Sequence, residues 1–293
     1  MSRFRQETPD GTPGDGAGAQ ALARFLERRP RLFVLTGAGC STASGIPDYR
    51  DPAGEWKHAR PVQYADFMAR HAVRQRYWAR SMVGWPRMAA AAPNRAHHAL
   101  TALQQRGQVE RLVTQNVDGL HQKAGTESVI DLHGRIDAVI CMACRLGLSR
   151  ADWQAEVAAL NPAWERHIGV ASERPDGDVE IAQADYAGFV VPPCPRCAGI
   201  VKPDVVFFGE AVPAGRVSEA KAALAGADAL LVVGSSLMVF SGFRFARHAA
   251  EADKPVVIVN RGRTRADDLA ALRIDGDCGE TLTAALEQSG SAA

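Results

Sequence analysis

Long apolar runs, net charge and cysteine are all scarce in this 293-residue sequence. The longest purely apolar runs, such as residues 229–233, fall far short of the ~18–20 residues that a membrane-spanning helix needs. Lys and Arg total 34 against 33 for Asp and Glu, so a formal net charge of +1 provides no field to attract nucleic acid. Six cysteines are too few for a disulfide scaffold. Membrane-spanning, nucleic-acid-binding and disulfide-rich classes are therefore disfavoured.

The composition is that of a globular protein, with 46% hydrophobic and 23% charged residues. The length allows one large domain, or one large domain with a smaller insertion. The first 20 residues lack the apolar core of a signal peptide and contain acids that a transit peptide avoids. We therefore expect residues 1–18 to be a flexible tail and the protein to be cytoplasmic.

Short runs rich in Val, Ile and Leu alternate with helical patterns along most of the chain. The expected strands are 31–36, 111–114, 129–132, 204–208, 229–233 and 256–260. Helices are expected at 19–29, 95–106, 214–225, 243–252 and 280–287. Nearly continuous apolar strands suit a parallel sheet covered by helices on both faces, so the pattern predicts a doubly wound α/β fold.

Two segments interrupt this alternation and predict a second, smaller lobe. Residues 61–88 are helical in pattern, and residues 141–197 are loop-rich and bounded by cysteine pairs. We assign 19–50, 95–140 and 201–293 to the α/β domain. The helical insert 51–94 and the module 141–200 then form the small domain.

Four of the six cysteines form two Cys-x-x-Cys pairs, Cys141 with Cys144 and Cys194 with Cys197. Two such pairs supply four thiolates, and an all-cysteine tetrahedron with no open position is typical of a structural zinc site. The alternative is that these are free or redox-active cysteines, and a single pair would be weak evidence for a metal site. Two pairs favour zinc.

A glycine turn, Gly37-Ala38-Gly39, follows the first expected strand. Thr42 stands where a dinucleotide fingerprint has its third glycine, and no strand ends in an acid ~20 residues later, so an ordinary dehydrogenase is disfavoured. The turn's backbone N–H groups still suit a pyrophosphate, with a purely structural turn as the alternative. Residues 44–50 then suit a lid over a polar ligand, or else a surface loop with one salt bridge.

Polar side chains follow two neighbouring expected strands. Gln115, Asn116 and Asp118 come after one, and His133 comes after the next. Ligands of open α/β sheets bind beyond the carboxyl ends of the strands, and histidine is the commonest general base near neutral pH. The alternatives are a simple turn and a structural histidine. We take His133 as the leading catalytic candidate.

Taken together, these motifs resemble the sirtuin family in type and order over about residues 20–288. The resemblance rests on Gly37-Ala-Gly39 with Ser41, Gly45-Ile-Pro-Asp-Tyr-Arg50, Thr114-Gln-Asn-Val-Asp118 with His121, Leu132-His-Gly134, the two cysteine pairs, Lys202–Glu210, Gly234-Ser-Ser236 and Asn260. Residues 74–80, 83–86, 201–210 and 264–270 are most similar to the class II branch. Tyr49 replaces a more usual Phe, and Cys40 stands where Ile or Val is common.

This resemblance implies an NAD-dependent protein lysine deacylase with a Rossmann-like domain and a zinc-binding small domain. NAD would be a consumed co-substrate, one Zn²⁺ would be structural, and acyl-lysine proteins would be the partners. His133 would be the general base, with Asn116 and Asp118 also catalytic. The implied NAD contacts are Gly37, Ala38, Gly39, Ser41, Asp48, Tyr49, Arg50, Gln115, Asn116, Val117, Asp118, Gly234, Ser235, Ser236, Asn260, Arg261, Gly262 and Cys278.

Substrate contacts are expected at two places. Val205, Val206 and Phe207 offer a strand edge to an extended peptide, unless this run is only an interior strand. Tyr77 and Arg80 are three apart on an expected helix and resemble the pair by which some sirtuins hold an acidic acyl group. The alternative is a solvated arginine beside a packed aromatic ring.

Two other functions remain open from the sequence alone. The chain could transfer ADP-ribose to a protein side chain from the same NAD site. It could also be a non-enzymatic NAD-binding module with the small lobe as a docking surface. Neither membrane nor nucleic acid is expected as a partner.

Overall fold

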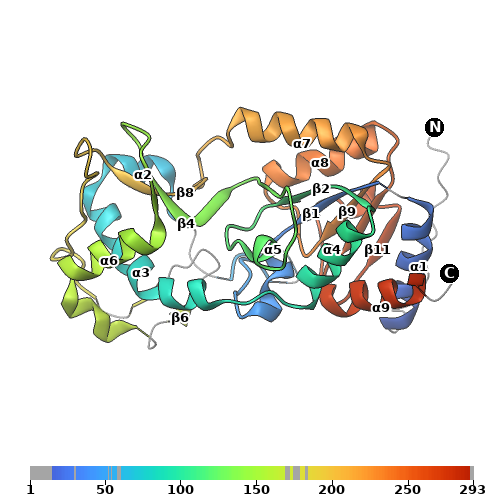
Figure 1. Ribbon diagram of the computed structural model, residues 1–293, viewed down its shortest axis with the longest axis horizontal. Coiled ribbons are helices and arrows are strands. Elements are labelled where there is room, and N and C mark those ends of the chain that lie inside the picture. The colour runs from blue at the N-terminus through green and yellow to red at the C-terminus, as the bar shows by residue number, and fades with distance from the viewer. Residues whose placement is uncertain are drawn as a thin grey trace.

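The larger of the two main sheets contains six parallel strands in the order β11-β10-β9-β1-β2-β3 (Figure 1). The computed structural model describes residues 15–290 apart from 30, 52, 54, 58–60, 169–171, 174–178 and 182–183. In chain order the strands are β1 (Leu32–Thr36), β2 (Val109–Thr114), β3 (Ile130–Asp131), β9 (Ala229–Val233), β10 (Val256–Val259) and β11 (Leu272–Ile274). The chain winds outward from β1 in both directions, which confirms the predicted doubly wound fold.

Helices cover both faces of this sheet because alternate side chains of each strand point to opposite faces. Leu32 and Val34 pack with α1 (Asp15–Arg28), α4 (Arg95–Gln105) and α9 (Cys278–Gly290). Phe33 and Leu35 pack on the other face with α7 (Ala214–Gly226) and α8 (Phe240–Glu251). The strand order reverses between β1 and β9, and ligands of open α/β sheets bind in the crevice beyond such a point.

A second, antiparallel sheet lies at the other end of the molecule (Figure 1). Its strands are β4 (Gly134–Cys141), β5 (Gly147–Ser149) and β8 (Val201–Val205), in the order β5-β4-β8. Three helices pack with it, α2 (Tyr64–Ala69), α3 (His71–Ala90) and α6 (Arg150–Leu160), around a core that includes Trp78 and Trp153. Two short strands, β6 (Ser172–Glu173) and β7 (Val179–Glu180), pair antiparallel, and β7 lies beside α3.

The prediction of a parallel strand at Asp204–Phe208 was wrong. The strand covers Val201–Val205 and pairs antiparallel with β4. Phe207 follows it as irregular chain, and Phe208 forms an isolated parallel bridge with Gln63. An apolar run indicates burial but not which sheet buries it, because both sheets here have apolar faces. Residues 134–141 and 201–205 therefore lie in the smaller sheet, and the predicted domain boundaries stay a proposal.

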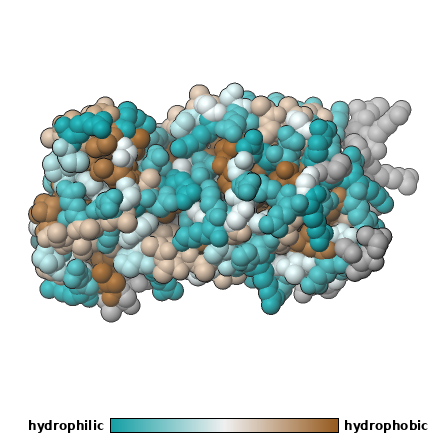
Figure 2. Space-filling model, viewed as in Figure 1, coloured by the Kyte–Doolittle hydropathy of each residue, from teal (hydrophilic) through white to brown (hydrophobic). Residues whose placement is uncertain are grey.

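The N-terminal helix begins earlier than expected. α1 starts at Asp15, inside the predicted tail of residues 1–18, and its apolar face, including Leu22 and Leu26, packs on α9. Residues 1–14 lie outside the described part of the chain. None of the described helices is long and apolar enough to cross a membrane. Hydrophilic residues predominate on the face shown in Figure 2, where hydrophobic residues form separate groups.

Gly134 joins the two sheets and admits no side chain. Its φ is +82°, and a Cβ there would lie 2.0 Å from the carbonyl oxygen of Asp204. We expect Gly134→Ala to lower the free energy of unfolding by about 2–4 kcal/mol, the sum of a positive-φ penalty and a backbone shift. Urea denaturation measures this change. Gly147→Ala is the control, because a Cβ at Gly147 would meet open space and the φ of this residue is not positive; equal effects of both substitutions would contradict the prediction.

Candidate active site

A pocket of about 510 Å³ opens beyond the carboxyl ends of β1, β2 and β9. This volume is within the ~300–1,000 Å³ that ligand sites usually have. Its lining comes from both sheets. Residues that follow β1 and β9 of the parallel sheet line one side, and residues 205–208, at the end of β8 of the antiparallel sheet and just after it, line another. The pocket therefore lies where the two parts of the chain meet.

Two glycine-containing loops interlock at the floor of this pocket. A Cβ on Gly37 would lie 2.7 Å from Ser235 Cβ, and a Cβ on Gly39 would lie 3.0 Å from the Gly234 oxygen. The Gly39 N–H donates to that oxygen at 2.8 Å, and the Gly37 N–H donates to Val233 at 3.1 Å. These two N–H groups, which we expected to face a pyrophosphate, instead bind the neighbouring loop. The glycines are needed for this close approach.

A polar network joins the loop after β1 to the loop after β2. Asn116 Nδ2 donates to the Gly37 oxygen and to Ser41 Oγ, both at 3.0 Å. Ser41 Oγ in turn donates to Asp118 Oδ2 at 2.7 Å, and Asp118 Oδ1 accepts the Leu120 N–H. Burial raises the pKa of Asp118, opposed by these hydrogen bonds. The three side chains, from two loops, are thus fixed against the same pocket.

His133 is held through both ring nitrogens. Nδ1 lies 2.9 Å from the carbonyl oxygen of Gln115, and Nε2 lies 2.7 Å from Ser241 Oγ. A carbonyl only accepts, so Nδ1 carries the proton. Burial lowers the pKa of His133 to about 4, against the Gln115 hydrogen bond, which raises it. The ring is therefore neutral at pH 7, with its lone pair on Nε2, which is the state that a general base requires.

Aromatic side chains form the opposite wall of the pocket. Tyr49, Trp56 and Phe208 contact one another edge to face, with ring centroids 5.6–6.4 Å apart. Tyr77 and Phe207 pack together with centroids 5.3 Å apart. The Val206 N–H donates to the His133 oxygen at 2.7 Å, which ties the segment after β8 to the histidine.

The Sir2 family profile matches residues 37–241 of this chain. An NAD-dependent protein deacetylase of Bordetella bronchiseptica is 58% identical over 263 residues, which are 90% of this chain and 95% of that protein. The chain belongs to the Sir2 family. The mitochondrial NAD-dependent protein lipoamidase sirtuin-4 of Bos taurus is 47% identical over 279 residues, 94% of this chain and 87% of that protein. A solved structure of Sir2 with p53 peptide and NAD⁺ has a TM-score of 0.74 at 28% identity, covering 93% of this chain and 99% of that one.

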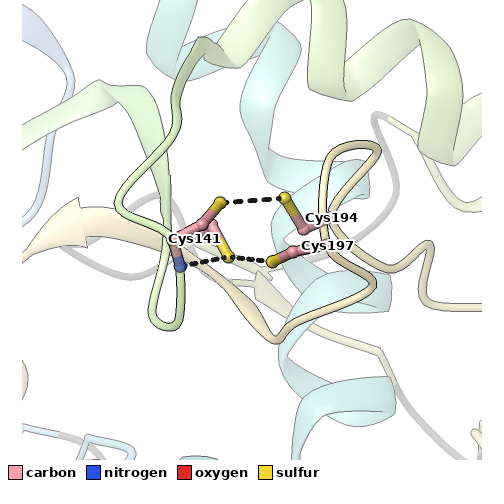
Figure 3. Close-up of side chains that lie close together, drawn as sticks. Cys141, Cys194 and Cys197 are labelled. Carbon is pink, nitrogen blue, oxygen red and sulfur yellow. Dashed lines mark hydrogen bonds between the residues drawn. The ribbon is translucent and has the colours of Figure 1, made fainter.

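The four cysteines of this Sir2 chain converge as the sequence predicted. Cys141 ends β4, and Cys194 and Cys197 lie in the turn that precedes β8 (Figure 3). The sulfurs of Cys141 and Cys197 are 3.5 Å apart, and those of Cys144 and Cys194 are 3.7 Å apart. Tetrahedral zinc with bonds of about 2.3 Å places its sulfurs about 3.8 Å apart. The four thiolates therefore fit a structural Zn²⁺ away from the pocket.

A second buried group, Cys40 with His97 and His121, does not suit a metal. His97 Nδ1 accepts the Asn94 N–H, so its Nε2 carries a proton rather than a lone pair. His121 Nε2 donates to Thr36 Oγ1, and burial raises the pKa of the Cys40 thiol, which stays protonated. Metal binding would require the loss of two protons, the one on His97 Nε2 and the one on the Cys40 thiol. We assign this group to the interior packing of the Sir2 fold.

The pocket contains most of the residues that the sirtuin resemblance singled out. Those that line it are Gly37, Ala38, Gly39, Ser41, Asp48, Tyr49, Arg50, Gln115, Asn116, Val117, Asp118, His133, Gly234, Ser235, Ser236, Asn260, Arg261, Cys278, Tyr77, Val205, Val206 and Phe207. Gly262 and Arg80 are not among its described lining residues. The sequence analysis did not identify Trp56, Asp277 and Ser241, because these residues belong to none of the motifs. Only their closeness in sequence to the loops that line the pocket could have suggested them.

Arg80 is directed away from the pocket although Tyr77, three residues earlier on α3, lines it. The Arg80 Nε donates to the backbone oxygen of Val179 in β7, and the residue is 5% exposed. Residues three apart share a helix face, but one helical turn of separation is enough to place the two side chains in different environments. The structure thus gives no support to an acidic-acyl pair at Tyr77 and Arg80.

Three buried histidines predict a steep acid sensitivity of folding. Burial lowers the pKa of His97 and His133 to about 4 and that of His121 to about 3. Because these values lie below the unfolded value near 6.5, the unfolded chain binds more protons as the pH falls below 6.5, and stability present above that pH is lost. Three such groups lower the unfolding free energy by as much as about 4 kcal/mol per pH unit near pH 5.

Urea denaturation at pH 7 and pH 5.5 tests this expectation. The midpoint should fall at pH 5.5, and His133→Phe should remove about a third of the decrease because one of the three groups is gone. An unchanged midpoint between the two pH values would contradict it.

Proposed function

We propose that this protein removes acyl groups from lysine side chains of proteins at the expense of NAD. Two kinds of similarity support this. Relatives with more than half of their residues identical are NAD-dependent protein deacetylases, and solved Sir2 structures of the same fold hold NAD⁺ with p53 peptide or an acetylated peptide.

The observation that carries the proposal is the state of His133. A neutral imidazole with its lone pair on Nε2 lines the same pocket as the polar network of Ser41, Asn116 and Asp118. The segment 205–207 lies on the far side of the same histidine, tied to it through Val206. The general base thus lies between the polar network and the apolar segment 205–207. This arrangement suits a reaction between a polar co-substrate, bound at the network, and a modified side chain, bound at the segment.

NAD supplies the ADP-ribosyl group that accepts the acyl group. Asn116 and Asp118 would hold the ribose next to nicotinamide, since amide and carboxylate groups pair with hydroxyls. The carbonyl oxygen of the acyl-lysine would bond to the ribose carbon that nicotinamide leaves. His133 Nε2 would then take the proton of a ribose hydroxyl so that this oxygen can attack the acyl carbon. Overall, acyl-lysine, NAD⁺ and water become lysine, nicotinamide and O-acyl-ADP-ribose, which balances the atoms.

The other half of NAD would lie along the loops after β9 and β10. Ser235, Ser236 and Asn260 line this end of the pocket, followed by Arg261 and Cys278. An extended substrate peptide would pair with the backbone of residues 205–207, which gives affinity with little dependence on sequence.

We also propose that the protein acts in the cytoplasm.

Nicotinamide release from NAD, measured over a panel of lysine peptides, tests the proposal. The panel carries acetyl, succinyl, glutaryl, branched and lipoyl groups, with the unacylated peptide as the control. We expect release with at least one acylated peptide and background release with the control. No release with any peptide would contradict the proposed function. Equal release with the acylated and the unacylated peptides would favour ADP-ribosyl transfer to another acceptor.

A further inference from the structure

The neutral ring of His133 makes a hydrogen bond that the proposed reaction does not use. With Nδ1 donating to Gln115, Nε2 can only accept, so the Ser241 hydroxyl donates to it at 2.7 Å. Ser241 is 9% exposed and is not among the described residues that line the pocket. It therefore contacts the general base from outside the pocket wall.

The start of α8 is shaped to make this contact. Ser241 and Gly242 are the second and third residues of the helix, directly after the loop that follows β9. A Cβ on Gly242 would lie 2.3 Å from Gln115 Oε1, so the Gln115 side chain would have to move to admit one. The same Gln115 accepts the His133 Nδ1–H through its backbone oxygen and donates from Nε2 to Ser235 Oγ at 2.9 Å. The imidazole is thus held between the end of β2 and the start of α8.

We propose that Ser241 is a positioning residue for His133, which fixes the plane of the ring through Nε2. The inference rests on the proposed function. Its chemistry follows from the hydroxyl group, which both donates and accepts. In the resting enzyme Ser241 donates to the Nε2 lone pair. Because Nε2 has a single lone pair, the Ser241 O–H must first turn away from it; the ribose O–H bond then breaks, an Nε2–H bond forms, and the Ser241 oxygen can accept the new N–H.

The matched pair Ser241→Thr and Ser241→Val separates the hydroxyl from the shape of the side chain. Both add a branched side chain, and only threonine keeps the hydroxyl. Two rates are measured with an acyl-peptide substrate: exchange of labelled nicotinamide into NAD, and formation of O-acyl-ADP-ribose. His133 acts on the ribose hydroxyl, after nicotinamide has left, so only the second rate depends on the base.

We expect Ser241→Val to lower product formation by about 3- to 10-fold, the factor that one hydrogen bond of ordinary net strength supplies. Nicotinamide exchange should stay within about twofold of the wild-type rate, since it does not involve the bond in question. Ser241→Thr should retain product formation. If the valine variant unfolds at a lower temperature, Ser241→Ala, which adds no bulk, decides with the same two rates.

Two results would overturn the inference. One is equal product formation by the threonine and valine variants at the wild-type level. The other is a parallel fall of exchange and product formation, which indicates a purely structural serine. A wild-type protein that releases no nicotinamide with any acyl-peptide would instead contradict the proposed function, so the two failures are distinct.

Discussion

Alanine in place of His133 is expected to lower the rate of acyl removal by about 10²- to 10⁴-fold, which is the usual contribution of a general base. The reason is that the substitution removes the Nε2 lone pair, in a ring that the Gln115 and Ser241 hydrogen bonds hold in place. Nicotinamide exchange into NAD should persist, because the base acts after the glycosidic bond has broken. Product formation and exchange are measured on the same preparation with a substrate from the peptide panel.

His248→Ala is the matched control for this variant. His248 lies on α8, is half exposed and is near Glu251 at the surface, so its loss should leave both rates unchanged. Undiminished product formation by His133→Ala would contradict the assignment of the base. It would show that another group takes the ribose proton.

Removal of one zinc ligand is expected to have the largest effect on folding. Structural Zn²⁺ contributes about 10–16 kcal/mol of apparent binding energy in zinc-finger peptides at pH 7, more than the whole stability of many domains. Cys194 is buried beside Cys144, so Cys194→Ala removes a ligand and leaves the chain between β4 and β8 without its cross-link. We expect one zinc per chain in the wild type by elemental analysis, almost none in the variant, and a large loss of thermal stability.

Cys40→Ser is the control for zinc content. Cys40 is also buried, but in its group both the Cys40 thiol and His97 Nε2 carry a proton that a metal would have to displace. The variant should keep one zinc per chain. Two zinc ions in the wild type, falling to one in Cys40→Ser, would show that the assignment of this group to interior packing is wrong. No zinc in the wild type would contradict the four-cysteine site.

The parts of the fold that could be predicted are those fixed by local pattern. Apolar runs such as 32–36 and 229–233 identify strands that are buried on both faces, and the Cys-x-x-Cys spacing indicates the metal site regardless of what lies between the pairs. The sheet in which residues 204–205 pair could not be predicted, because the partner strand β4 is distant from them in the sequence. β4 itself was missed, since its alternating burial reflects a sheet that only tertiary contacts create.

The candidate site shows the same division. Strand-end polar residues such as Asn116 and His133 were found because parallel strands end at one edge of a sheet. Ser241 was not, because its role depends on how α8 approaches Gln115, and nothing near it in the sequence indicates this. The contact of Arg80 with the Val179 oxygen could not be predicted either, because helical spacing gives a shared face but not which carbonyl the guanidinium meets.

Mass spectrometry of an acyl-lysine peptide incubated with the protein and NAD distinguishes acyl removal from ADP-ribosyl transfer. We expect the peptide to lose the mass of its acyl group, with one nicotinamide and one O-acyl-ADP-ribose formed for each peptide converted. A peptide or protein that gains the mass of ADP-ribose while keeping its acyl group would contradict the account, and so would a peptide whose mass never changes while NAD is consumed.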